Sequence, residues 1–156
     1  MELFGLQPGF FVAEAAKFKA PRADWKITRV SILGWDGFNG SVKSVPSERI
    51  IDLEIRDKDS NLLYRFADSQ LPYTNFAFNR TGLMFINIDL PSIPVNGEFY
   101  ICFYDRDAVR LAFETLNQTD NSFIFVNPSK EMVPAEIPTG KNETSPIGWI
   151  MEVTGN

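Results

Sequence analysis

Short runs of alternating apolar and polar residues, separated by Gly, Pro, Asn and Asp, recur along the chain at intervals of about ten to fifteen residues. Alternation with a period of two places successive side chains on opposite faces of a strand. The clearest runs are 51–56, 83–90 and 99–104, and further candidates are 10–18, 25–33, 62–67, 122–126 and 149–153. The pattern predicts about eight or nine strands in an all-β sandwich or barrel.

The alternation also divides each expected strand into two sides. In the run 51–56, the apolar residues point one way, and the charged Asp52, Glu54 and Arg56 point toward solvent. The run 99–104 is apolar on both sides, which suits a central strand. We therefore expect one core between two sheets, formed by Ile51, Leu53, Ile55, Phe99, Ile101 and Phe103.

One segment has helical rather than strand-like spacing. In 107–116, Val109, Ala112, Phe113 and Leu116 recur at intervals typical of one helix face, so we expect at most one short helix. The chain has no internal repeat, low-complexity tract or long linker, which predicts a single domain over 1–156. Its first residues fit a natural start and the cut end of a longer secreted protein equally well.

Composition and charge exclude several classes of protein. Hydrophobic residues make up 44% of the 156 residues and charged residues 22%, which indicates a globular chain. The formal net charge is -5 and the basic residues are scattered, so nucleic acid and anionic membrane surfaces are not expected partners. No apolar stretch is long enough to span a bilayer, and no signal peptide is recognisable, so direct membrane insertion is not expected.

Histidine is absent and cysteine occurs once. Ser-His and Cys-His catalysis and His-ligated zinc are therefore impossible, and no Gly-rich phosphate loop is present. Cys102 lies in an apolar run and is expected to be a core residue. Acid catalysis by a carboxylate pair stays open, with Glu54, Glu98 and Glu152 as candidates, although carboxylates in alternating strands usually form a solvated face.

The segment 57–61 has the spacing of a calcium loop. Asp57, Asp59 and Asn61 occupy the first three ligand positions, and Asp68 falls at the twelfth. Leu62, however, replaces the glycine that the sharp turn of such a loop requires. A hairpin turn between two strands is the favoured interpretation, because Asp and Asn bond their own backbone in turns, and calcium is the alternative cofactor.

Two turn-rich segments carry large aromatic rings. Residues 34–41 contain Trp35 and Phe38, and residues 71–78 contain Tyr73, Phe76 and Phe78. Exposed rings in loops would offer stacking platforms for a sugar or a peptide. Rings in long loops also fold back to close the open end of a sandwich, and this plugging role is the favoured interpretation.

N-glycosylation acceptor sequences are more frequent than chance predicts. The content of Asn, Ser and Thr gives about one site by chance, whereas four occur, at Asn39, Asn79, Asn117 and Asn142. All four lie in expected loops or at the end of the expected helix. The excess favours a glycosylated extracellular or cell-surface domain, with all four side chains exposed.

Three stretches together resemble a known class of module. They are GFFVAEAAKFKAP (9–21) followed by WKI (25–27), GEFYICF (97–103), and SFIF (122–125) leading to WIM (149–151). They are similar to jelly-roll β-sandwich accessory modules of uncharacterised archaeal and bacterial secreted or membrane-anchored proteins. The resemblance implies a two-sheet antiparallel jelly roll, an accessory role without catalytic residues, and a turn at Pro21 after an apolar Phe18.

These observations lead to one functional hypothesis and two alternatives. We expect a non-catalytic extracellular or cell-surface module that binds a glycan, a peptide or a neighbouring domain. The first alternative is a carboxylate-dependent glycoside hydrolase, which requires two acids converging in a groove. The second is a purely structural spacer of an envelope protein, which requires no groove.

Overall fold

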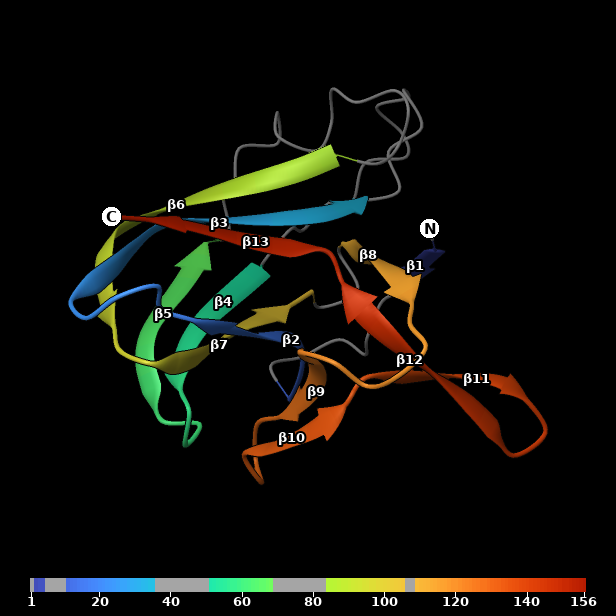
Figure 1. The fold of residues 1–156 in the computed structure, drawn as a ribbon. Coiled ribbons are helices and arrows are strands. Elements are labelled where there is room, and N and C mark those ends of the chain that lie inside the picture. The colour runs from blue at the N-terminus through green and yellow to red at the C-terminus, as the bar shows by residue number, and fades with distance from the viewer. Residues whose placement is uncertain (1, 5–10, 36–50, 69–83, 106–108) are drawn as a thin grey trace.

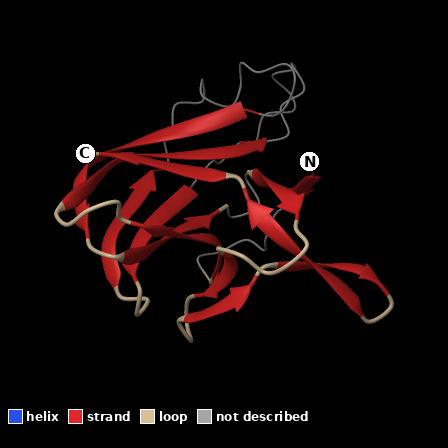
Figure 2. Cartoon of the chain, viewed as in Figure 1, coloured by secondary structure: helices blue, strands red, loops and turns tan. Residues whose placement is uncertain are grey.

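The computed structural model describes residues 2–4, 11–35, 51–68, 84–105 and 109–156 (Figure 1). Within these ranges the chain forms thirteen β-strands and no helix (Figure 2). The strands are β1 (Glu2–Phe4), β2 (Val12–Lys19), β3 (Trp25–Trp35), β4 (Ile51–Asp57), β5 (Leu62–Asp68), β6 (Met84–Val95), β7 (Glu98–Tyr104), β8 (Arg110–Thr115), β9 (Ser122–Val126), β10 (Glu131–Pro134), β11 (Glu136–Gly140), β12 (Glu143–Trp149) and β13 (Met151–Gly155).

The strands form two antiparallel sheets with the connectivity of a jelly roll. The first eight strands are divided between the two sheets in the orders β1-β8-β3-β6 and β2-β7-β4-β5. This arrangement of eight strands in two packed sheets is the jelly-roll sandwich. The predicted fold class, an all-β two-sheet sandwich of jelly-roll type, is confirmed.

The last five strands are added to this eight-stranded frame. β9 and β10 extend the second sheet beyond β2. β8 pairs with β3 only through Leu111 and Arg110, and the C-terminal segment fills the space where these two strands separate. There β12 pairs with β8 and β13 pairs with β3. The hairpin of β11 and β12 projects from the body of the sandwich (Figure 1).

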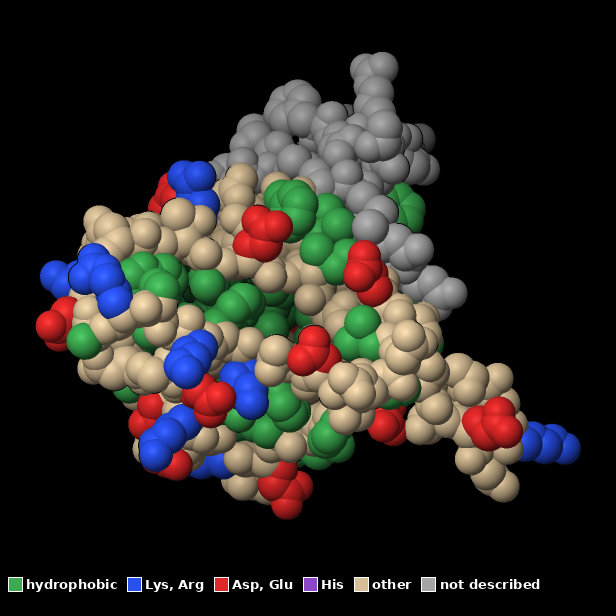
Figure 3. All heavy atoms as spheres, in the orientation of Figure 1, with side chains coloured by type: hydrophobic (Ala, Val, Ile, Leu, Met, Phe, Trp, Pro, Cys, Tyr) green, Lys and Arg blue, Asp and Glu red, His purple; other side chains and the backbone are tan. Residues whose placement is uncertain are grey.

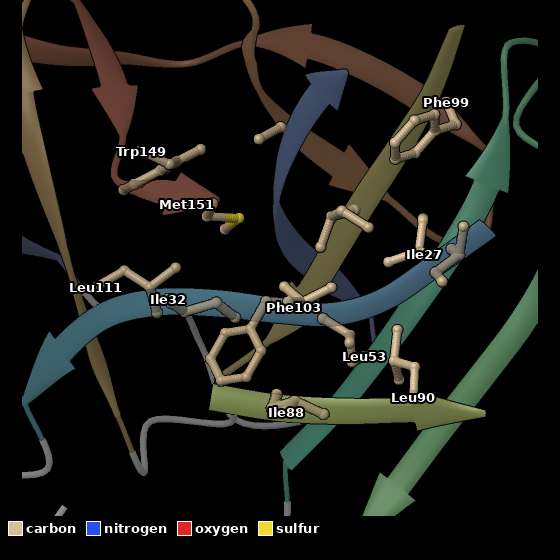
Figure 4. Close-up of a cluster of buried hydrophobic side chains, with 14 of the residues drawn as sticks. Ile27, Ile32, Leu53, Ile88, Leu90, Phe99, Phe103, Leu111, Trp149 and Met151 are labelled. Atoms are coloured by element: carbon tan, nitrogen blue, oxygen red, sulfur yellow. The ribbon is translucent and has the colours of Figure 1, made fainter. Parts of the chain in front are cut away.

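Both sheets bury their inner faces in one hydrophobic core (Figure 4). The predicted core is confirmed for five side chains, which are all buried in it: Leu53, Ile55, Phe99, Ile101 and Phe103. The side chain of Ile51 lies outside the described residues. Across the core they meet Ile27, Ile32 and Ile88 from β3 and β6. β7 lies between β2 and β4, so its predicted central position is also confirmed.

The expected helix at 107–116 is wrong, because residues 110–115 form β8. Leu111, Ala112 and Phe113 are all buried, so β8 is covered on both faces. A strand of this kind has no polar side, and its apolar residues therefore match helical spacing by coincidence.

The expected number of strands is too low. β10, β11 and β12 lack a regular apolar alternation, and they carry Pro134, Pro138 and Pro146, so no pattern marked them. The expected strand 149–153 is also divided, because Ile150 separates β12 from β13. β2 ends at Lys19, and the chain turns through Pro21 before β3 begins at Trp25.

Replacing Phe103 by Ala is expected to lower the free energy of unfolding by about 3 to 5 kcal/mol, because its ring is fully buried between the sheets. The control is Phe85→Ala, since the Phe85 ring is exposed on β6, and it should cost less than about 1 kcal/mol. Urea unfolding of both variants measures the difference. Equal losses would contradict the described core.

Candidate functional site

An open groove of about 350 Å³ lies between β2 and the segment that joins β12 to β13. Its walls come from four parts of the chain, namely β2, the end of β8, the start of β9 and residues 148–151. Figure 3 shows a hollow with hydrophobic atoms at its floor, between the positions of β13 and β2 in Figure 1. Ligand sites in proteins commonly have volumes of about 300 to 1,000 Å³, so the groove has room for a ligand.

The floor of the groove is held by specific contacts. The backbone N–H of Trp149 donates to Ser122 Oγ (2.9 Å), and its indole Nε1–H donates to the carbonyl of Phe123 (3.0 Å). The Trp149 ring also meets Phe113 edge-on, with ring centroids 6.1 Å apart. These contacts tie the first sheet to β9 of the second. The groove is therefore preformed by packed strands rather than by loops alone.

The rim of the groove is polar and mainly acidic. Glu114, Asp120 and Asn121 are exposed there. The ammonium group of Lys17, the basic residue of the lining, lies 3.8 Å from the carboxylate of Glu98. An apolar floor with a few polar groups around it is the usual composition of a binding site.

Of the predicted aromatic platform, only Trp35 lies within the described residues. It ends β3, is half-buried, and is not among the residues that line the groove. Phe38, Tyr73, Phe76 and Phe78 lie outside the described ranges. Both the stacking and the plugging interpretations of these rings stay predictions.

The segment 57–61 forms a turn closed by the carboxylate of Asp57. Oδ1 of Asp57 accepts hydrogen bonds from the backbone N–H groups of Asp59 and Asn61, both at 2.9 Å. Oδ2 accepts one from the side-chain amide of Asn61 at 3.0 Å. These bonds agree with the hairpin-turn interpretation. Within the described ranges, no three His, Cys, Asp or Glu side chains are grouped to hold a metal ion, and a calcium site here stays a prediction.

The three candidate catalytic carboxylates do not converge. Glu54 lies on the outer side of β4, in the second sheet, and is fully buried. Glu98, at the start of β7, is four residues from Cys102, the partner of Glu54, and is therefore separated from Glu54 by about 13 Å along the strand. Glu152 is on β13 in the opposite sheet, where it points away from the core-facing Met151. No acid pair of the predicted kind forms among them.

The expectation that Asp52, Glu54 and Arg56 face solvent is wrong, because all three are buried. They lie on the outer side of the second sheet, beside a second hydrophobic cluster of Ala13, Ala15, Cys102, Tyr104 and Phe125. Strand alternation assigns residues to the two faces of a sheet, but it does not show whether the second face is exposed to solvent. The sequence does contain one indication that this face is buried, because the neighbouring strand β7 is apolar on both sides and contributes Cys102 and Tyr104 to the second cluster.

Glu54 is the centre of a network of charge-assisted hydrogen bonds. Arg56 Nε donates to Glu54 Oε2 at 2.7 Å, and Tyr104 Oη donates to the same oxygen at 3.0 Å. The guanidinium of Arg65 binds the other oxygen of Glu54 and lies 3.5 Å from Asp52. The guanidinium of Arg56 also stacks over the ring of Phe125, 4.7 Å from its centroid. Removing Glu54 would leave the buried guanidinium of Arg56 without its carboxylate partner.

The two carboxylates of this network have pKa values shifted in opposite directions. Burial raises the pKa of Asp52 to about 6, against the opposing charge of Arg65 and with a contribution from Glu54. Burial also opposes the charge of Glu54, but hydrogen bonds from Arg56 and Arg65 outweigh it and lower the pKa of Glu54. Burial raises the pKa of the Cys102 thiol and so favours its neutral form.

Glu14 is a further buried acid that the sequence did not mark. It lies on the inner side of β2, at an alternating position with Ala16 and Phe18. Burial and the neighbouring charge of Asp105 raise the pKa of Glu14 well above its usual range. The interior therefore favours the protonated form of this carboxyl.

Two of the four predicted glycosylation sites lie in the described residues. Asn117 and Asn142 are both exposed, and Asn142 has a positive φ of 65° in the turn between β11 and β12. Asn39 and Asn79 lie outside the described ranges. The exposure that an acceptor site requires is present at both described residues, while occupancy stays a prediction.

Comparison of the chain with protein-family models, with curated proteins and with solved structures gives no match. The resemblance to accessory modules of secreted proteins therefore stays a prediction. Among the described residues, no helix is long and apolar enough to cross a membrane.

Asp52 is expected to make stability depend on pH. Its folded-state pKa of about 6 exceeds the ordinary value of 3.8, so the folded state holds this proton more tightly than the unfolded state. The free energy of unfolding should therefore fall as pH rises from about 4 to about 6, by about 1 to 3 kcal/mol for this group.

The test compares urea unfolding of the wild-type protein and Asp52→Asn between pH 4 and pH 7.5. Subtracting the two curves removes the titration of groups common to both proteins, and the difference should show the fall assigned to Asp52. Asp89→Asn, which removes an exposed carboxylate paired with Arg29, should retain the wild-type slope. A wild-type slope in Asp52→Asn would contradict the assignment.

Proposed function

We propose that this chain is a non-catalytic binding module of an extracellular or cell-surface protein, and that the groove between β2 and β13 is its ligand site. The observation that carries the proposal is the groove itself. It is preformed, has an apolar floor around Trp149 and Met151, and has polar side chains at its rim. A glycan, a peptide or a segment of a neighbouring domain would each find both kinds of contact there.

The spacer alternative does not explain this groove. A spacer needs two packed sheets and a solvated surface, whereas here the meeting of the sheets leaves an open space lined by four chain segments. Trp149 donates both of its N–H groups to β9, which positions its large apolar ring at the floor. Trp149 is only 6% exposed and therefore shapes the floor, while the half-buried Phe18 and Leu116 offer more apolar surface to a ligand.

The geometry favours binding over glycoside hydrolysis. Such hydrolysis uses two carboxyl groups about 5 to 9.5 Å apart on either side of the substrate bond. Asp52 and Glu54 are neighbouring acids whose pKa values are shifted in opposite directions, yet both are buried and are engaged with Arg65. Glu114 and Asp120 face the groove, and they serve the proposal as hydrogen-bond acceptors at its rim.

Filling the groove is expected to abolish binding. Leu116 lines it next to Gly148, so Leu116→Trp places a bulky ring inside. The control is Val133→Trp, because Val133 is exposed on β10 outside the groove lining. Circular dichroism and thermal melting establish that both variants fold.

The probes are arrays of immobilised glycans and of ten-residue peptides, with the affinity of each hit measured by fluorescence anisotropy. Leu116→Trp should weaken the hits at least about tenfold, while Val133→Trp should bind as the wild-type protein does. Hits that bind Leu116→Trp equally well would place the ligand site elsewhere. The absence of any hit would favour the spacer.

The proposed extracellular location predicts N-glycosylation of the exposed acceptor residues. Asn117 and Asn142 are exposed between strands, and neither lines the groove, although Asn117 directly follows the lining residue Leu116. Mass spectrometry of the protein from its native source should find a glycan on at least one of them. Bare sites together with recovery of the protein in the cytoplasmic fraction would contradict this part of the proposal.

A further inference from the structure

β13 is an edge strand with unpaired backbone groups. It pairs with β3 on one side, and none of the described strands pairs with its other side (Figure 1). The carbonyl of Ile150 accepts from Leu33 N–H, and the pairing continues in register through Val153. Because adjacent residues of a strand direct their backbone groups to opposite sides, those of Met151 and Val153 point away from β3.

Several other edge strands of the sandwich carry proline, although β5, at the end of the second sheet, does not. β6 carries two prolines, and β10 and β11 carry one each. Proline on an edge strand is a common protection, since it offers no N–H to an incoming chain. β13 contains no proline. Its backbone is therefore available for pairing.

The free edge of β13 begins at the groove. Met151 is both the first residue of β13 and part of the groove lining, together with Trp149 and Ile150. A peptide paired with β13 would direct every second side chain toward the sandwich, where the groove offers Phe18, Leu116 and Trp149 as apolar contacts. Main-chain bonds and a side-chain pocket would then act on the same ligand.

The negative charge around the groove favours basic peptides over acidic ones. Glu114 and Asp120 are exposed at the rim, and Lys17 lies near Glu98, which offsets its charge. The whole chain also has a formal net charge of -5. A partner with Lys or Arg beside its apolar side chains would complement this surface, whereas an acidic partner would be repelled.

We propose that the groove and the free edge of β13 together bind an extended peptide segment that carries apolar and basic side chains. This inference rests on the proposed function, and it names the ligand class of the same site. The peptide adds a strand beside β13, inserts an apolar side chain into the groove, and places a Lys or Arg near Glu114 and Asp120.

The first experiment reverses the rim charges. The probe is the tightest-binding peptide from the ten-residue array, measured by fluorescence anisotropy. Glu114→Lys/Asp120→Lys should weaken binding of a basic probe at least about tenfold. The matched control Glu131→Lys/Glu143→Lys changes the net charge by the same amount at exposed acids outside the groove lining, and it should stay within about twofold.

The second experiment tests the backbone contacts. N-methyl groups are placed on alternate amides of the probe peptide, in the two possible phases. The phase that blocks the amides facing β13 should weaken binding by about fivefold per amide, while the other phase should have a much smaller effect. Equal effects of both phases would contradict strand addition.

The remaining outcomes separate this inference from the proposed function. Glycan hits that Leu116→Trp abolishes, without any peptide hit, would overturn the peptide assignment and leave the groove as a binding site. A wild-type dimer in light scattering that excess probe peptide does not dissociate would make a second copy of this chain the occupant of β13, and would overturn the inference. No hit of any class would contradict both proposals.

Discussion

The pairing of β3 on both of its edges is the constraint on which the rest of the first sheet depends. One edge pairs with β6 from Trp25 to Gly34, and the other is shared between β13 and β8. Ile27, Val30 and Ile32 are fully buried, because β3 is central in its sheet and faces the second sheet across the core. Since β8 contacts β3 only at its end, the C-terminal segment has a place to enter, and the groove results from this entry.

The second sheet is unusual because much of it is buried on both faces. Its inner face carries Phe99, Ile101 and Phe103, and its outer face carries Cys102 and Tyr104 from the same strand. Charged side chains on the outer face of β4 are therefore desolvated and must bond to one another. The carboxylate of Glu54 accepts hydrogen bonds from Arg56, Arg65 and Tyr104, so this network fixes the relative positions of β4, β5 and β7. Its role is structural, and the ligand site proposed above lies apart from it.

Residue alternation was sufficient to predict the sandwich, because the inner positions of β4 and β7 follow a strict period of two. It failed where both faces of a strand are buried. The apolar residues of β8 match a helical spacing, since Leu111, Ala112 and Phe113 leave no polar side to define a strand period. The same limit applied to Glu54, whose carboxylate has the sequence context of a solvated face but the surroundings of an interior. Local patterns do not report what covers the second face of a sheet.

The groove was beyond prediction for a different reason. Its floor and rim combine Phe18, Glu114, Asp120 and Trp149, which are far apart in the sequence and form no motif. They meet because the C-terminal strands are inserted into a jelly-roll frame that is already complete in its eight-strand connectivity. The insertion supplies Trp149 and Met151 to the floor and leaves the backbone of β13 unpaired on one side. The added strands therefore extend the fold and complete the groove proposed here as the ligand site, to which β2 and β8 of the frame contribute Phe18 and Glu114 and the C-terminal segment contributes Trp149 and Met151.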